Sequence, residues 1–315
     1  MGDFHQNGSV STLHNLGQRP TEEIERELSL FKKSRPMGLV LPSLYSELEG
    51  PALSGIVSEL SKVPYLEEIV IGLDNATLDQ YKYSIEYFSK LQHHHRILWN
   101  DGPRLKEIDQ KLQKAGLAPT QKGKGRNVWY CIGMSIARDT ARSVALHDCD
   151  IKTYDRRMLA KLFYPVVNPL FNFEFCKGYY PRVADGKMNG RVARLLVFPL
   201  LTALEKTIGK SDYLDFMKSF KYPLAGEFSF RRNVLPELRI SSDWGIEIGI
   251  LSEMQRSYSP QNICQVDLAE TYDHKHQKLS IDDETKGLSR MSIDCLLYTS
   301  PSPRDLSTSR MPSSA

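Results

Sequence analysis

Short apolar runs alternate with amphipathic segments along the first half of the chain, and this order constrains the fold more than any other feature. The runs 37–42, 67–73 and 95–99 have the length of buried strands. The segments 51–62 and 77–91 between them carry apolar residues at helical spacing. Strands that alternate with helices favour a mostly parallel sheet with helices on both faces. The sequence therefore predicts an α/β fold.

The residues that follow these predicted strands are the ones that matter most for ligand binding. They are residues 42–47, Asp74 with Asn75, and Asn100 with Asp101. In open parallel sheets, ligands bind outside the carboxyl ends of the strands. We therefore expect the binding site at this edge of the sheet.

Two carboxylates end a further predicted strand at 143–150. Asp148 and Asp150 are two residues apart, so strand alternation directs both side chains to the same side. Two close carboxylates repel each other unless a cation neutralises them, and Mg²⁺ or Mn²⁺ suits such ligands. A solvated strand end is the alternative interpretation. His274 or His276 is a candidate third ligand, and the run 93–95, three histidines, is a competing one.

Two glycine-containing basic loops are candidate anion sites. The first, KGKGRNVW at 122–129, contains Lys124, and a helix is expected to follow it. It lacks the spacing of a Walker A loop. The second, at 186–196, places Gly190 and Arg191 at the start of an apolar helix. A flexible basic turn and a surface arginine are the respective alternatives.

Carboxylates also occur among apolar residues in the second half of the chain. These are Glu227, Asp243 and Glu247, and each needs a partner if it is buried. A structural ion pair and a contact with a sugar hydroxyl fit equally well. Trp244 fits a place in the core better than stacking on a sugar. Helix-like stretches at 155–164, 191–207 and 245–257 give this half a mixed pattern.

Composition restricts the remaining function classes. With 41 basic and 38 acidic residues, the net charge of +3 argues against a protein that wraps nucleic acid. The five cysteines are widely spaced and form no CxxC pair, which argues against a disulfide framework and favours the cytoplasm. No run approaches the roughly 18 apolar residues of a membrane span, and the N-terminus does not resemble a signal peptide.

Seven segments together carry a family resemblance. In order between about Met37 and Leu279 they are LPSLYSELEG, GKGRNVW, HDCD, NGRVARLLVFPLL, PLAGEFS, WGIEIGIL and CQVDLAETYDHKHQ. They resemble the glucosyl-3-phosphoglycerate synthases, which are retaining glycosyltransferases with the GT-A fold. The resemblance implies transfer of glucose from UDP-glucose, or a related sugar nucleotide, to 3-phosphoglycerate, with Mg²⁺ or Mn²⁺ and as a homodimer. The alternatives are another sugar or acceptor, or a nucleotide-sugar-binding protein without turnover.

The resemblance also implies a role for individual residues. Those at the sugar nucleotide are Pro42, Leu44, Glu47, Asp74, Lys124 and Asp148. The metal ligands are Asp150 and His274, with Asp148 nearby. The acceptor site comprises Gly190, Arg191, Val192 and His276. Asp150, Glu247 and Arg191 are the implied catalytic residues. Ala193 stands where the family has threonine, which removes one possible hydrogen bond to the acceptor.

The expected organisation has four parts. Residues 1–36 form an N-terminal helical extension with a helix at 21–34, and residues 37–150 form the nucleotide-sugar-binding half. Residues 151–279 form a mixed region that binds acceptor and metal. Residues 280–315 form a poorly structured tail, whose last twenty residues, rich in Ser and Pro, resemble translated sequencing-adapter read-through. A disordered natural tail is the alternative interpretation.

Overall fold

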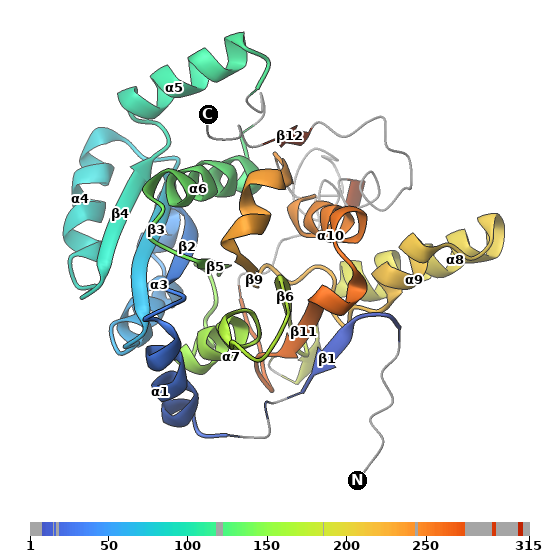
Figure 1. Ribbon diagram of the computed structural model, residues 1–315. Coiled ribbons are helices and arrows are strands. Elements are labelled where there is room, and N and C mark those ends of the chain that lie inside the picture. Colours follow the sequence, from blue (N-terminus) through green and yellow to red (C-terminus); the bar gives the residue numbers. More distant parts are fainter. Residues whose placement is uncertain are drawn as a thin grey trace.

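An eight-stranded sheet forms the centre of the computed structural model (Figure 1). The structure describes residues 8–14, 16, 19–117, 122–184, 186–242, 245–274, 292–293 and 308–310. The strand order is β1-β11-β6-β9-β5-β2-β3-β4. The strands are β1 (Ser11–Leu13), β2 (Met37–Leu44), β3 (Leu66–Asp74), β4 (His94–Trp99), β5 (Ser143–Leu146), β6 (Phe175–Tyr179), β9 (Phe228–Arg231) and β11 (Ile263–Asp267).

The sheet is mostly parallel, as the sequence predicts. β9 pairs antiparallel with both β5 and β6, and the other pairings in this sheet are parallel. The carboxyl ends of β2, β3, β4 and β5 therefore meet at one edge of the sheet. Residues that follow these strands are brought together there.

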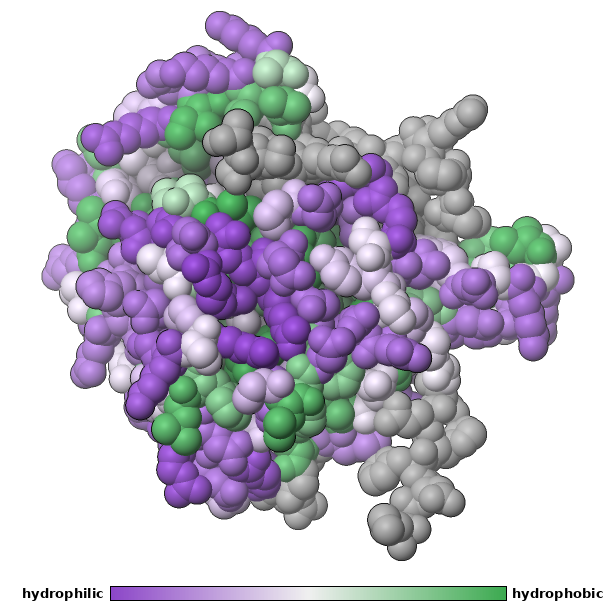
Figure 2. All heavy atoms as spheres, in the orientation of Figure 1, coloured by the Kyte–Doolittle hydropathy of each residue, from purple (hydrophilic) through white to green (hydrophobic). Residues whose placement is uncertain are grey.

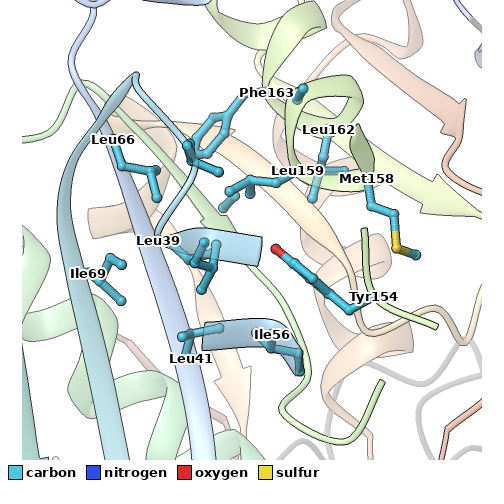
Figure 3. Packing of buried hydrophobic residues seen from close by; sticks show 14 of the residues in the cluster. Leu39, Leu41, Ile56, Leu66, Ile69, Tyr154, Met158, Leu159, Leu162 and Phe163 are labelled. Atoms are coloured by element: carbon cyan, nitrogen blue, oxygen red, sulfur yellow. The ribbon is translucent and has the colours of Figure 1, made fainter. Parts of the chain in front are cut away.

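Helices cover both faces of the sheet, because the strand residues alternate between two apolar cores. Leu39 and Leu41 belong to one core, whereas Val40 between them belongs to the other. The first core is closed by α1 (Thr21–Phe31), α3 (Pro51–Leu60), α4 (Leu78–Phe88) and α7 (Arg156–Val167). Figure 3 shows Ile56 of α3 and Leu159 of α7 directed toward Leu39 and Leu41.

The second core lies on the opposite face of the sheet. It is covered by α6 (Lys124–Arg138), α8 (Phe198–Ile208), α9 (Asp212–Lys218) and α10 (Ile246–Ser257), with α5 (Pro103–Lys114) at its margin. Figure 1 shows α8 extending away from the rest of the domain. The short elements are α2 (Tyr45–Leu48), β7 (Val183–Ala184), β8 (Lys187–Met188), η2 (Ala193–Val197), η3 (Arg232–Glu237), β10 (Arg239–Ser241), η4 (Pro260–Asn262) and β12 (Thr308–Arg310).

Two strand ends differ from the prediction. β2 continues through Pro42 to Leu44, because β5 pairs with β2 only as far as Val40 and a residue without an N–H is tolerated beyond it. β5 ends at Leu146, so Asp148 and Asp150 lie in the segment that follows the strand. Their side chains are half-buried while His147 and Cys149 are buried, so the expected alternation continues without strand pairing.

Both ends of the chain also differ from the expected organisation. Residues 1–36, expected to be a helical extension, contribute strand β1, which pairs with β11, as well as α1, which packs on α7. In the tail, expected to lack regular structure, β12 pairs antiparallel with β10. The eight-stranded sheet contains strands from both predicted halves, 37–150 and 151–279. Within the described residues, no helix is long and apolar enough to cross a membrane.

Candidate active site

Lys124 bridges two carboxylates at the edge of the sheet where the strands end. Its Nζ lies 2.6 Å from Oδ1 of Asp148 and 2.9 Å from Oε1 of Glu247. Lys124 is the first residue of α6, Asp148 follows β5, and Glu247 lies in the first turn of α10. Three residues that lie far apart in the sequence thus form one charged cluster.

A glycine lets α6 begin close to its neighbours. A Cβ at Gly125 would overlap the carbonyl group of Ser241, so a larger residue would push the start of the helix away. The N–H of Arg126 donates to the carbonyl oxygen of Ser242 at 3.0 Å. The glycine-rich basic loop is therefore needed to seat the helix start, and with it Lys124, in the site.

The charges of the cluster shift the pKa values of its members. Burial alone would lower the pKa of Lys124, but the charges of Asp148 and Glu247 outweigh it and the net shift is upward. Burial alone would raise the pKa of Asp148, but the charge of Lys124 outweighs it and the net shift is downward. His274 acts on Asp148 in the same direction, so it belongs to the same neighbourhood. Lys124 and Asp148 are thus both charged at neutral pH.

Asp150 and His274 form a second pair beside this cluster. Nδ1 of His274 lies 3.4 Å from Oδ2 of Asp150. An antiparallel bridge between Ile151 and His274 brings the two together, and the N–H of Lys152 donates to the carbonyl of Asp273 at 2.9 Å. Both side chains are about one quarter exposed, at 24% and 23%. The pair is therefore accessible to a ligand.

The donor chemistry of this pair fits a divalent metal ion. A carboxylate and an imidazole suit Mn²⁺, and Mg²⁺ commonly takes one or two carboxylates together with substrate phosphates. No group of three or more metal-ligating side chains gathers within the described residues. Asp148, the third predicted ligand, contacts Lys124 instead. The pair thus leaves most coordination positions to a substrate.

Glu227 is fully buried, and the residue before it, Gly226, lies against Asp148 of the Lys124 cluster. Tyr180 and Tyr272 donate hydrogen bonds to its carboxylate at 2.6 and 2.7 Å, and their rings stack on each other. Burial raises the pKa of Glu227, and the charge of Asp148 adds to that effect. A Cβ at the preceding residue, Gly226, would overlap the Asp148 carboxylate. The partners of the Glu227 carboxylate are therefore two tyrosine hydroxyls and not the structural ion pair that the sequence offers as one possibility.

The residues predicted to border the nucleotide lie at the same strand ends. Pro42 and Leu44 are in the last part of β2, and Glu47 is half-buried in α2. Asp74 ends β3 with 5% exposure, and its Oδ1 accepts from the N–H of Asn75 at 3.1 Å. Burial and the charge of Asp101 raise the pKa of Asp74. The topology thus gathers this predicted set beside the start of α6.

The predicted acceptor loop lies in a separate segment. Gly190 has φ +73°, a left-handed conformation that favours glycine, and it precedes Arg191, which is exposed, and Val192, which is buried. Arg191 makes no hydrogen bond or ion pair within the described residues, so no contact of either kind joins it to the Lys124 cluster. His276 lies outside the described residues.

Arg182 links this loop to the buried carboxylate, and the sequence analysis missed it. Its carbonyl accepts from the N–H of Asn189 at 2.6 Å, and its guanidinium donates to Tyr222 at 3.1 Å. The same guanidinium lies 5.8 Å from the ring centre of Tyr272. Tyr180 and the fully buried Lys177 were also missed. Strand alternation alone does not distinguish a buried lysine from a solvated one.

Comparison with known proteins identifies the family. No family model matches the chain. A glucosyl-3-phosphoglycerate synthase of Persephonella marina is 45% identical over 294 residues, which cover 93% of this chain and 72% of that protein. One of Methanococcoides burtonii is 40% identical over 295 residues, which cover 93% and 71%.

Solved structures match the fold. The glucosyl-3-phosphoglycerate synthase of Mycobacterium tuberculosis, in complex with Mn²⁺, UDP and glucosyl-3-phosphoglycerate, gives a TM-score of 0.65 at 24% identity and covers 92% of this chain and 87% of that chain. The mannosyl-3-phosphoglycerate synthase of Rubrobacter xylanophilus gives a TM-score of 0.65 at 20% identity and covers 91% and 79%. The fold is thus of the GT-A type. By its identity to the curated relatives, this chain belongs to the glucosyl-3-phosphoglycerate synthase family of glycosyltransferases.

Proposed function

We propose that this chain transfers glucose from UDP-glucose to 3-phosphoglycerate with retention of configuration. The observation that carries the proposal is the Lys124 bridge between Asp148 and Glu247, beside the pair of Asp150 and His274. This arrangement offers one cation for a diphosphate and two ligands for a metal. The relatives named above are glucosyl-3-phosphoglycerate synthases. One solved structure of similar fold holds Mn²⁺, UDP-glucose and phosphoglyceric acid.

The donor binds at the ends of β2, β3 and β5 in this proposal. Pro42, Leu44, Glu47 and Asp74 border the nucleotide, and Lys124 contacts the diphosphate. Asp150 and His274 hold Mg²⁺ or Mn²⁺, with Asp148 close by. When bound, the metal stabilises the negative charge that grows on the departing diphosphate.

Residues of the chain supply the remaining contributions. Lys124 adds a positive charge at the same leaving group, and its place between Asp148 and Glu247 orients it before substrate binds. Glu247 contacts the transferred sugar. Arg191 grips the anionic acceptor by paired hydrogen bonds, with Gly190, Val192 and His276 around it. Most of the rate then comes from proximity and electrostatic stabilisation.

Release of UDP from UDP-glucose tests this function directly. We expect release that requires both 3-phosphoglycerate and Mg²⁺ or Mn²⁺ and that stops when a chelator is added. A protein that binds UDP but releases none with any acceptor would instead be a nucleotide-sugar-binding protein without turnover. Activity with another sugar nucleotide or acid in a panel, and none with this pair, would move the assignment within the glycosyltransferases.

We also propose that the chain forms a homodimer and acts in the cytoplasm. The projecting helix α8 presents Ile208 at 57% exposure, and Leu195 on the preceding η2 is 62% exposed. Figure 2 shows hydrophobic residues among the hydrophilic ones on this projecting part. Such residues suit a contact with a second copy.

The cysteines bear on the compartment. The four described cysteines are free and buried, in keeping with a reducing compartment. For the homodimer, light scattering should give a molar mass of twice that of the chain, and Leu195→Asp should reduce this mass to that of one chain.

A further inference from the structure

A small pocket lies on the sheet far from the strand ends that carry the candidate active site. It has a volume of about 170 Å³ and is lined by Glu68, Ile69, His94, His95, Arg96 and Arg138. Glu68 and His94 stand opposite each other near the beginnings of β3 and β4. Asp74 lies at the other end of β3, roughly 20 Å away along the strand. The pocket is therefore a separate site.

The pocket exists because helices cover the first part of β4 incompletely. α6 packs on β2 and β3 and ends at Arg138. Two apolar residues of α5, Leu105 and Leu112, share a core cluster with Leu98 near the other end of β4. β4 is an edge strand of the sheet (Figure 1). His94 and Arg96 come earlier on the same face of β4, and both are exposed. They border an open space beside the end of α6.

The charges around the pocket favour an anion. Arg96 and Arg138 supply two guanidinium groups, and the imidazole of His94 supplies a further donor. The carboxylate of Glu68 compensates only one of these charges, because its Oε2 accepts from Nε of Arg138 at 2.6 Å. Two adjacent guanidinium groups repel a metal ion, so Glu68 and His94 do not make a cation site.

The second oxygen of Glu68 adds a requirement to the ligand. Glu68 is only 3% exposed, and its Oε1 has no hydrogen-bond partner among the residues that the structure describes. A buried carboxylate oxygen without a donor is costly. An ionised carboxylate accepts hydrogen bonds and donates none. A ligand that fits this pocket therefore combines negative charge with a proton to donate.

We propose that this pocket binds inorganic phosphate. The guanidinium group of Arg96 and free donors of Arg138 bind phosphate oxygens. Both forms of phosphate present near neutral pH retain a P–OH, which donates to Oε1 of Glu68. Sulfate has the same shape but no proton at this pH, so the site selects against it. Pockets for larger organic ligands begin at about 300 Å³, whereas this one suits a small ion.

Calorimetric titration of the full chain with phosphate and with sulfate tests the proposal. The chain is first saturated with UDP and Mg²⁺, which occupy the donor side of the candidate active site, and with 3-phosphoglycerate, which occupies the proposed acceptor loop. We expect phosphate to bind at least about tenfold more tightly than sulfate. Arg96→Ala should weaken phosphate binding by about tenfold or more. Glu68→Gln should remove the preference for phosphate, because an amide also donates to sulfate.

Two control variants distinguish binding in this pocket from binding at the acceptor loop and from a general effect of surface charge. Arg26→Ala removes an exposed charge from α1 and should leave phosphate binding unchanged. Arg191→Ala alters the proposed acceptor loop and should also leave it unchanged. Equal affinity for phosphate and sulfate in the unmodified chain would overturn the proposal. So would loss of phosphate binding in Arg191→Ala, or full retention in Arg96→Ala. Melting curves with UDP establish that Glu68→Gln and Arg96→Ala remain folded.

Discussion

Nζ of Lys124 lies 2.6 Å from Oδ1 of Asp148, and this contact joins the start of α6 to the segment that follows β5. Both side chains are 23% exposed, so water screens the pair only in part. Glu247 approaches the same nitrogen from α10. A single lysine thus connects α6, the segment after β5 and α10. The order of these elements in the sequence does not indicate that they are in contact.

Lys124→Met should destabilise the fold in a pH-dependent way. The variant leaves two carboxylates without their cation, at a cost of about 1–3 kcal/mol. The folded-state pKa of Asp148 is lowered from 3.8, so its stabilisation is present above that pH and disappears as the pH falls below it. The difference in unfolding free energy between wild type and variant should therefore be constant from about pH 5 to 8 and shrink below about pH 4.

Urea unfolding between pH 3 and 8 measures this difference, with Lys122→Met as the matched control. Lys122 pairs with Asp101 at 3.1 Å, but its side chain is 61% exposed. An exposed pair contributes less than about 1 kcal/mol. If Lys124→Met loses no more unfolding free energy than the control, Lys124 does not stabilise the cluster.

Asp150→Asn should remove metal-dependent turnover while the fold persists. The amide keeps the size of the side chain but loses the negative charge that holds a divalent ion beside His274. We expect kcat to fall by about 100-fold or more and manganese affinity by at least about tenfold. Turnover assays across a manganese titration, with a melting curve for folding, provide the measurement. Undiminished activity would exclude Asp150 as a metal ligand.

The pattern of apolar residues was enough to predict the α/β class and the sheet edge at which the strand-end residues gather. Runs such as 37–42 and 67–73 are continuous because parallel strands are buried on both faces, and polar residues follow where the strands end. Asp148 and Glu247 could be named because each is a charge beside apolar residues, and Lys124 because it lies in a glycine-containing basic loop. Their mutual contact could not be predicted, since it depends on how α6 and α10 pack.

Other features depend on pairing between distant segments. The short strand β1 carries no clear pattern by itself and exists because β11 offers it an edge. The helix predicted at 77–91 is longer than the observed α4, which ends at Phe88. Apolar spacing does not set where a helix ends. Strand alternation likewise gave no reason to place Lys177 in the core, where its ammonium donates to the carbonyl of Ala225.

Lys177→Met should flatten the pH dependence of stability on the alkaline side. Burial lowers the pKa of Lys177 from 10.5 to about 8, despite the opposing charges of Glu247 and Glu227. Between these values the unfolded chain holds a proton that the folded chain has released, so stability rises with pH. Relative to the variant, wild type should gain about 3 kcal/mol between pH 8 and 10.5. Chemical unfolding at pH 7 to 10.5 measures the unfolding free energy of wild type and variant. If the two free energies change in parallel with pH, the pKa of Lys177 is not lowered.

Arg191→Ala should affect the acceptor far more than the donor. Arg191 is exposed on the loop after Gly190 and makes no ion pair or hydrogen bond within the described chain, so its removal leaves no buried partner uncompensated. The KM for 3-phosphoglycerate should rise by about tenfold or more, and the KM for UDP-glucose should change little. Arg194→Ala, an exposed arginine three residues later, is the control. Equal changes in both KM values would refute the placement of Arg191.

Gly226→Ala should impair catalysis through Asp148 without replacing any charged residue. A Cβ at Gly226 would overlap the Asp148 carboxylate, which must then move away from Lys124. We expect kcat/KM for UDP-glucose to fall by about 100-fold. Gly55→Ala is the matched control, because nothing lies within 4 Å of a Cβ at that position in α3. It should stabilise the fold by about 0.5–1 kcal/mol and leave kcat/KM unchanged. If both variants are fully active, the position of Asp148 does not control the reaction.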